Sequence, residues 1–288
     1  MPTFPRRRKP GTPPKGPRFS RLKKRFAPRT QGRAAGERSR GIYLLPNAFT
    51  TAALFCGFYA IVMAMNQRFD QACWAVFIAM ILDGLDGRIA RLTNTQSEFG
   101  AQYDSLADMV SFGAAPALVM YEWSLNGLGK VGWVAAFIYC ACAALRLARF
   151  NTNIEVVDKR FFQGLPSPAA AALVIGFIMM MIDPDISVIP RKVEWVSWCI
   201  TVFAGLTMVS NVPFYSFKDI NFRKSVPFIA VFLIALVLAL LAIDPPKVLW
   251  PIFVIYGLSG YAVYVWQRAK GKRVSIIPLD DADDDLHR

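Results

Sequence analysis

Residues 83–113 read DGLDGRIARLTNTQSEFGAQYDSLADMVSFG and place four aspartates beside glycines, directly after the almost wholly apolar residues 73–82. A carboxylate at the centre of a membrane-spanning helix costs about 2.5–3.5 kcal/mol on insertion scales, so these aspartates need a compensating partner. Asp83 and Asp86 are three residues apart, and Asp104 and Asp108 are four apart, so each pair lies on one helical face. Two such faces brought together would form a cage of oxygens, which hard divalent cations such as Mg²⁺ prefer.

The whole chain has the composition of a membrane protein. Hydrophobic residues make up 55% of its 288 residues, and the mean hydropathy is +0.35. Apolar runs of about 18–22 residues predict transmembrane helices. We place eight of them, at residues 43–65, 71–91, 101–121, 131–150, 165–182, 193–212, 226–243 and 248–267. The sequence therefore predicts an all-α, polytopic membrane helix bundle.

Basic residues predict which side of the membrane each connection faces. Residues 1–41 contain fourteen Lys or Arg and one acid, Glu37, and further basic residues recur at alternate connections. By the positive-inside tendency both termini are cytoplasmic, which agrees with an even number of spans. Both aspartate pairs would then lie at similar depth near the cytoplasmic face. We predict a protein of the inner, cytoplasmic membrane with its site facing the cytoplasm.

The chain divides into three predicted parts: a basic cytoplasmic tail at residues 1–41, a transmembrane domain at 42–268 and a C-terminal cytoplasmic tail at 269–288. The first tail has too little apolar material to fold alone. Beside a span, a polybasic segment is more typical of binding to anionic membrane lipids than to nucleic acid, so we predict no nucleic-acid partner. The first apolar run starts too far into the chain, and is too long, for a cleavable signal.

Small residues and an arginine share the faces of the aspartates. Gly87, Ala90 and Arg91 follow at helical spacing on the face of the first pair, and Gly100 precedes the second pair by one turn. The small residues leave space for a large group, and Arg91 offers a planar fork of donors suited to phosphate. The only histidine is His287, so a histidine-based triad is excluded. The pattern indicates a site for a metal-bound diphosphate.

These residues resemble the signature of the CDP-alcohol phosphatidyltransferases, D-x2-D-G-x2-A-R-x8-G-x3-D-x3-D. The chain matches every fixed position, with Asp83, Asp86, Gly87, Ala90, Arg91, Gly100, Asp104 and Asp108. The resemblance implies a helical membrane protein, usually a homodimer, with two divalent ions, Mg²⁺ or Mn²⁺, at the cytoplasmic face. It also implies that all four aspartates bind metal and that Asp108 takes the proton from the attacking alcohol.

The resemblance further implies a binding site for the CDP group of a CDP-diacylglycerol substrate. A PN-x2-T element in the first span, also seen in the family, should face the nucleotide. The expected site residues are Asn47, Thr50, Gly87, Ala90, Arg91, Ser97 and Gly100.

Beyond the signature, the chain looks like the membrane-integral CDP-diacylglycerol–serine O-phosphatidyltransferases. The similar segments are DSLADMVSFGAAPA (residues 104–117), ALRLARFN (144–151) and FQGLPSPAAA (162–171). This likeness implies transfer of a phosphatidyl group from CDP-diacylglycerol to L-serine.

The acceptor site is predicted near the cytoplasmic end of the fourth span. Arg146 and Arg149 lie there, and a guanidinium could hold the serine carboxylate with two hydrogen bonds. Anchoring at the membrane interface explains either arginine alone equally well. We expect Arg149 with Phe150 in the serine pocket, with Arg146 as a further candidate. Ser111, Gly113 and Ser167 are weaker candidates, because small residues in spans commonly serve packing.

Other functions stay open at this point. Within the family, the acceptor could instead be glycerol 3-phosphate, an inositol phosphate or choline. Acids inside spans also occur in ion-coupled transporters. A non-catalytic membrane anchor would place all function in residues 1–41.

Overall fold

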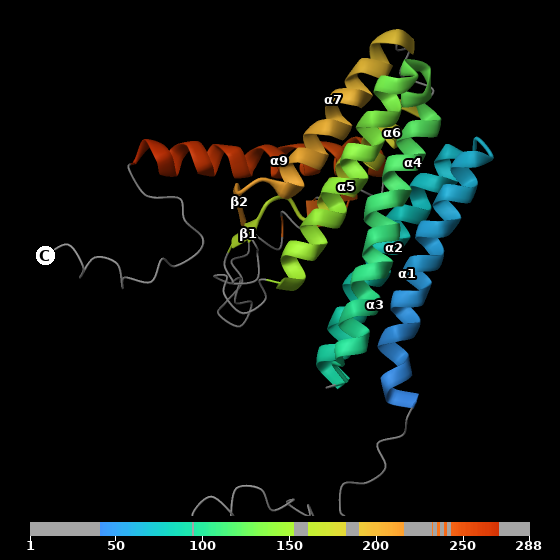
Figure 1. The fold of residues 1–288 in the computed structure, drawn as a ribbon, viewed down its shortest axis with the longest axis vertical. Helices are drawn as coiled ribbons and strands as arrows, with labels where there is room; N and C mark the ends of the chain where they lie inside the picture. The colour runs from blue at the N-terminus through green and yellow to red at the C-terminus, as the bar shows by residue number, and fades with distance from the viewer. Residues whose placement is uncertain are drawn as a thin grey trace, which may run out of the picture. The chain divides into compact units, whose positions relative to one another are not determined.

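The computed structural model describes residues 41–93, 95–152, 161–182, 190–215 and 243–270, with residues 232, 235–236 and 239–240 in addition. Its α-helices are α1 (Gly41–Met65), α2 (Phe69–Thr93), α3 (Glu98–Asp108), α4 (Ala115–Trp123), α5 (Lys130–Thr152), α6 (Ser167–Ile182), α7 (Pro190–Val209) and α9 (Pro245–Ala269). The π-helical segment η2 (Met109–Ala114) joins α3 to α4, and the 3-10 turn η3 (Leu125–Leu128) precedes α5. Figure 1 shows how these helices are arranged. The predicted all-α class is confirmed.

Two short strands are the other regular elements in the described part of the chain. They are β1 (Phe161–Gln163) and β2 (Pro213–Tyr215), which pair antiparallel with Phe162 opposite Phe214. This small ribbon joins the segment before α6 to the segment after α7.

Most of the predicted spans correspond to helices. Three described helical segments are long and apolar enough to cross a membrane, namely Leu45–Met65, Lys130–Thr152 and Pro245–Trp266, while Ser167–Ile182 and Val193–Val209 are shorter apolar helices. The predicted span at 71–91 corresponds to α2, and the one at 101–121 falls within the continuous α3, η2 and α4. The span at 226–243 lies mostly outside the described residues, as do both predicted tails. The chain is therefore membrane-associated, and the count of eight spans stays a prediction.

Small residues let the helices approach closely. α1 and α2 pack along each other, and both helices carry buried alanines, among them Ala53, Ala60, Ala72 and Ala79. Interfaces of this kind suit membrane helices, whose association depends on close packing rather than on a hydrophobic driving force. Large apolar side chains such as Phe55 remain on the outer surface of the bundle, where lipid would cover them.

α6 supplies the centre of the bundle. Its residues from Ala169 to Met179 are all buried, and it contacts α2, α4, α7 and α9. A helix that is apolar on every side is typical of such a central position. α9 crosses α6 and α7 (Figure 1). There the Trp250 indole donates to the Leu173 carbonyl at 3.2 Å, and the hydroxyls of Tyr261 and Thr207 lie 2.8 Å apart.

Candidate active site

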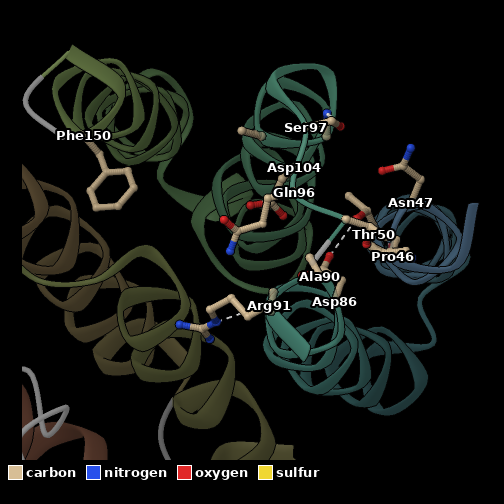
Figure 2. Close-up of a pocket in the computed structure, with 14 residues that line it drawn as sticks. Pro46, Asn47, Thr50, Asp86, Ala90, Arg91, Gln96, Ser97, Asp104 and Phe150 are labelled. Atoms are coloured by element: carbon tan, nitrogen blue, oxygen red, sulfur yellow. Dashed lines mark hydrogen bonds between the residues drawn. The ribbon is translucent and has the colours of Figure 1, made fainter. Parts of the chain in front are cut away.

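A pocket of about 480 Å³ lies among α1, α2, α3 and the end of α5 (Figure 2). Its lining comprises Pro46, Asn47, Thr50, Asp86, Gly87, Ala90, Arg91, Thr95, Gln96, Ser97, Gly100, Ala101, Asp104 and Phe150. All seven residues expected to surround the CDP group are among them. The structure thus gathers into one cavity residues of the PN-x2-T element, residues of the signature and Ser97, which lies between two signature positions.

A hydrogen bond between α1 and α2 fixes one wall of the pocket. The Thr50 hydroxyl donates to Asp86 Oδ2 at 2.7 Å, and both side chains are buried. Thr50 Oγ1 also lies 3.2 Å from the carbonyl oxygen of Pro46, one turn earlier. The PN-x2-T element therefore has a clear local purpose: it orients a carboxylate that the neighbouring helix contributes.

The start of α3 forms a second wall that favours anions. Ser97 caps the helix by accepting a hydrogen bond from the Gly100 amide at 3.0 Å. A Cβ on Gly100 would lie 3.1 Å from Ser97 Oγ, so glycine leaves space for this cap. Ser97, Gly100 and Ala101 all line the pocket, which places the positive end of the α3 dipole beside it.

Arg91 on α2 contributes a positive charge to the pocket wall. Its Nε donates to the Gly87 carbonyl at 2.9 Å, which holds the guanidinium against its own helix (Figure 2). The side chain is exposed, so the guanidinium is accessible to a ligand. An oriented guanidinium beside a helix N-terminus suits a diphosphate.

Gly87 offers a test of what fills the pocket. A Cβ on Gly87 would meet no atom within 4 Å, so Gly87→Ala fits the empty protein. If the CDP group occupies this space, the extra methyl group should raise the KM for CDP-diacylglycerol by about tenfold, equivalent to ~1.4 kcal/mol of binding. Steady-state kinetics with varied CDP-diacylglycerol measures the change.

Gly84→Ala is the matched control for this prediction. A Cβ on Gly84 also meets nothing within 4 Å, and Gly84 does not line the pocket. Both substitutions put alanine in a helix interior, where each should stabilise the helix by roughly 0.5–1 kcal/mol. Equal KM values for the two variants would contradict the placement of the nucleotide against Gly87.

Three of the four aspartates converge at the inner side of this pocket. One carboxylate oxygen each from Asp83, Asp104 and Asp108 lies within 4.8 Å of the other two. Asp104 Oδ1 is buried and has no hydrogen-bond partner among the described residues. Two unit charges about 4 Å apart repel by roughly 4 kcal/mol at an effective dielectric constant of about 20. The cluster therefore fits a divalent cation, because bound positive charge removes this repulsion and satisfies the buried oxygen.

Asp86 stands beside this cluster. It is close enough to interact electrostatically with both Asp83 and Asp104, while its Oδ2 accepts the hydrogen bond from Thr50. The two aspartate pairs thus lie next to each other, while their depth in the membrane stays a prediction. Hard oxygen ligands in this number and arrangement suit Mg²⁺ or Mn²⁺.

The three residues predicted to bind serine lie in different environments. Phe150 lines the pocket from the side of α5, across from α1 (Figure 2). The Arg149 guanidinium donates to the Val209 carbonyl at 2.9 Å and to Asn211 Oδ1 at 3.3 Å, which ties the end of α5 to the end of α7. Arg146 points toward the aspartates.

Arg146 is a half-buried cation beside the carboxylate cluster. Its Nη1 donates to the Ser167 hydroxyl at 2.7 Å, at the start of α6. Its side chain interacts electrostatically with Asp108, and its buried Nε has no hydrogen-bond partner among the described residues. A guanidinium with one donor that no described residue uses therefore lies next to the expected base.

Several functional neighbours could not be found from the sequence. Thr95 and Gln96 line the pocket but fall in the variable gap of the signature, so no pattern marks them. Asn211 joins Arg149 to Gln163, whose amide donates to Asn211 Oδ1 at 2.7 Å. Among the weaker candidates, Ser167 contacts Arg146, whereas Ser111 donates to the Ala53 carbonyl at 3.1 Å and serves helix packing.

Comparison with known proteins identifies the family of this chain. The sequence profile of the CDP-alcohol phosphatidyltransferases matches residues 43–266. A protein of Helicobacter pylori named CDP-diacylglycerol–serine O-phosphatidyltransferase is 36% identical over 217 residues, covering 75% of this chain and 90% of that protein. Proteins of the same name from Mycobacterium leprae (31% identical, 78% of this chain and 75% of theirs) and Methanocaldococcus jannaschii (35% identical, 65% and 82%) are also similar. The chain belongs to the CDP-alcohol phosphatidyltransferase family.

Proposed function

We propose that this enzyme transfers the phosphatidyl group of CDP-diacylglycerol to the hydroxyl of L-serine, giving phosphatidylserine and CMP. One observation carries the proposal: the carboxylates of Asp83, Asp104 and Asp108 converge beside a pocket lined by all seven residues expected to hold the CDP group. The relatives named as serine phosphatidyltransferases, found in bacteria, archaea and yeast, support serine as the acceptor.

The proposed placement of the donor follows from the chemistry of the pocket walls. The cytidine lies in the cavity between Asn47 and Ser97, and the diphosphate extends past Arg91 and the start of α3 toward the aspartates. The acyl chains stay in the surrounding lipid. The small side chains at Gly87 and Ala90 allow the diphosphate to approach the backbone of α2.

The four aspartates would hold two divalent ions. When bound, these ions would neutralise the negative charge of the diphosphate. Asp108 takes the proton from the serine hydroxyl as that oxygen forms a bond to the phosphorus bearing diacylglycerol. The bond from this phosphorus to the bridging oxygen breaks, and CMP leaves with that oxygen. Asp108 suits this role because it faces both the carboxylate cluster and Arg146.

The acceptor is proposed to bind between Asp108 and α5. The free Nε of Arg146 would hold the serine carboxylate, which brings the serine hydroxyl toward Asp108. Phe150 and Arg149 remain in the proposal as neighbours of the acceptor on the same helix. A phosphorylated acceptor would need more positive charge, whereas Arg146 is the cation that interacts with Asp108 in the described part of the chain.

The proposal includes the setting of the enzyme. The basic connections and the apolar helices support an inner-membrane protein whose site faces the cytoplasm. We propose a homodimer on the family resemblance alone. The basic segment at residues 1–41 would contact anionic membrane lipids rather than take part in the reaction.

A panel of acceptors tests the function. Purified enzyme in lipid vesicles with Mn²⁺ and CDP-diacylglycerol should release CMP with L-serine and give only background release with glycerol 3-phosphate, inositol phosphate or choline. CMP release with one of those alcohols in place of serine would correct the acceptor.

The same assay separates the other classes of protein. Ion flux in sealed vesicles with no CMP release from any alcohol would favour a transporter. A variant lacking residues 1–41 should keep most of its activity, and loss of all activity would favour the membrane-anchor interpretation.

A further inference from the structure

The helix that carries Asp104 and Asp108 changes from α-helical to π-helical geometry directly after Asp108. Pro116 has no amide hydrogen, so the carbonyl of Phe112, four residues earlier, lacks its α-helical donor, and the proline ring would clash with that carbonyl. The backbone instead forms the π-helical segment η2, in which the Ala115 amide bonds to the Val110 carbonyl five residues back. Such π-turns are rare and are often found at functional sites.

α5 supplies the donor that the proline removes. The Tyr139 hydroxyl donates to the Phe112 carbonyl at 3.0 Å. Tyr139 is fully buried, and a buried hydroxyl is costly without a partner. The Tyr139 hydroxyl therefore gives the Phe112 carbonyl a donor, and the carbonyl gives the buried hydroxyl an acceptor.

The same face of α5 also reaches the carboxylate cluster. Tyr139, Ala143 and Arg146 lie at helical spacing along that face. A Cβ on Gly113 would lie 3.2 Å from the Ala143 Cβ, so α5 and η2 are in close contact there. One turn further on, Arg146 interacts with Asp108.

α1 holds η2 from the opposite side. The Ser111 hydroxyl donates to the Ala53 carbonyl at 3.1 Å. A Cβ on Gly57 would lie 2.6 Å from Ser111 Oγ, so only glycine allows this approach. The π-helical turn is thus held by a hydrogen bond to α1 and by another to α5.

We propose that Tyr139 is a positioning residue for the metal ligands of α3. Its hydrogen bond holds η2 in the π conformation, which sets where the Asp104 and Asp108 carboxylates lie relative to Asp83. Closing the turn to an α-helix would rotate α3 against α4 and move those oxygens. This inference rests on the proposed metal site and adds a residue that the signature does not contain.

Direct Mn²⁺ binding tests the proposal. Free Mn²⁺ is measured by electron paramagnetic resonance during titration of purified protein in nanodiscs without substrate. Tyr139→Phe should weaken Mn²⁺ binding by roughly tenfold, the effect typical of removing a group that orients metal ligands. Its KM for CDP-diacylglycerol at saturating Mn²⁺ should stay close to that of the parent, because Tyr139 does not line the pocket.

Tyr261→Phe is the matched control. It removes a hydroxyl that bonds to Thr207 between α9 and α7, away from the aspartates. It should leave Mn²⁺ affinity unchanged even if the thermal stability falls. Equal Mn²⁺ affinities for Tyr139→Phe and the parent would overturn the inference and leave the proposed function intact. A parent protein that binds no Mn²⁺ would overturn both.

Pro116→Ala gives an independent test through a double-mutant cycle. Alanine restores an amide at position 116 that can donate to the Phe112 carbonyl, so the tyrosine hydroxyl becomes less necessary. Tyr139→Phe should therefore weaken Mn²⁺ binding less in the Pro116→Ala background than in the parent. An equal loss in both backgrounds would mean that Tyr139 does not act through this carbonyl, which would overturn the proposal.

Discussion

Replacing Asp108 with asparagine should lower kcat by about 10²–10⁴-fold, because the amide cannot accept the proton of the attacking hydroxyl. Asp108 is the residue that joins the carboxylate cluster to Arg146, so it faces both the proposed metals and the proposed acceptor. CMP release from CDP-diacylglycerol and L-serine at saturating substrates measures the effect. Asparagine has nearly the same volume, so the fold should be retained.

Two controls separate proton transfer from other effects of this substitution. Asp70→Asn removes an exposed carboxylate at the other end of α2 and should leave kcat unchanged. Raising the Mn²⁺ concentration should restore activity if Asp108→Asn only weakens metal binding, and should fail to restore it if the base is lost. Near-normal turnover of Asp108→Asn would rule out Asp108 as the base.

Replacing Arg146 with glutamine should raise the KM for L-serine by about 10–100-fold, as expected for loss of a charged hydrogen bond worth roughly 1.5–3 kcal/mol. The buried Nε of Arg146 has no partner in the described part of the chain, and we propose that the acceptor carboxylate pairs with this guanidinium. The KM for CDP-diacylglycerol should change little, because Arg146 does not line the nucleotide pocket. Kinetics with each substrate varied in turn separates the two effects.

The neighbouring arginines make this experiment specific. Arg88→Gln removes an exposed charge from α2 and should leave both KM values unchanged. Arg149→Gln should mainly lower the thermal stability, because its guanidinium holds the Val209 carbonyl and Asn211. A larger rise in the serine KM for Arg149→Gln than for Arg146→Gln would move the acceptor site toward Arg149. Arg146→Lys should be intermediate, since lysine keeps the charge but loses the planar fork.

Much of the site could be predicted because its residues follow one another at helical spacing. The four aspartates, Gly87, Ala90, Arg91 and Gly100 lie on two short stretches of helix, so the sequence states which of them share a face. The pocket contains each of the seven expected nucleotide contacts. Thr95 and Gln96 could not be predicted because they lie outside the helices, where the spacing of residues does not indicate which way their side chains point.

The roles of the arginines on α5 could not be predicted in the same way. Arg146 and Arg149 are three residues apart and differ little in sequence context, yet one contacts Ser167 near the aspartates and the other contacts the end of α7. The sequence analysis favoured Arg149 with Phe150. The geometry favours Arg146, because the rotation of α5 against α3 and α6 decides which guanidinium faces Asp108.

The amino-acid sequence by itself determined the helical membrane class and the family, and it predicted which residues would bind metal and nucleotide. Those properties follow from the lengths of the apolar segments and from the spacing of residues within one helix, so they do not depend on how the helices pack. Only the tertiary structure decided that Asp83, Asp104 and Asp108 converge, that Arg146 lies beside them, and that Tyr139 completes the carbonyl left open by Pro116. These relations join residues on different helices, so they depend on how the helices rotate and pack against one another.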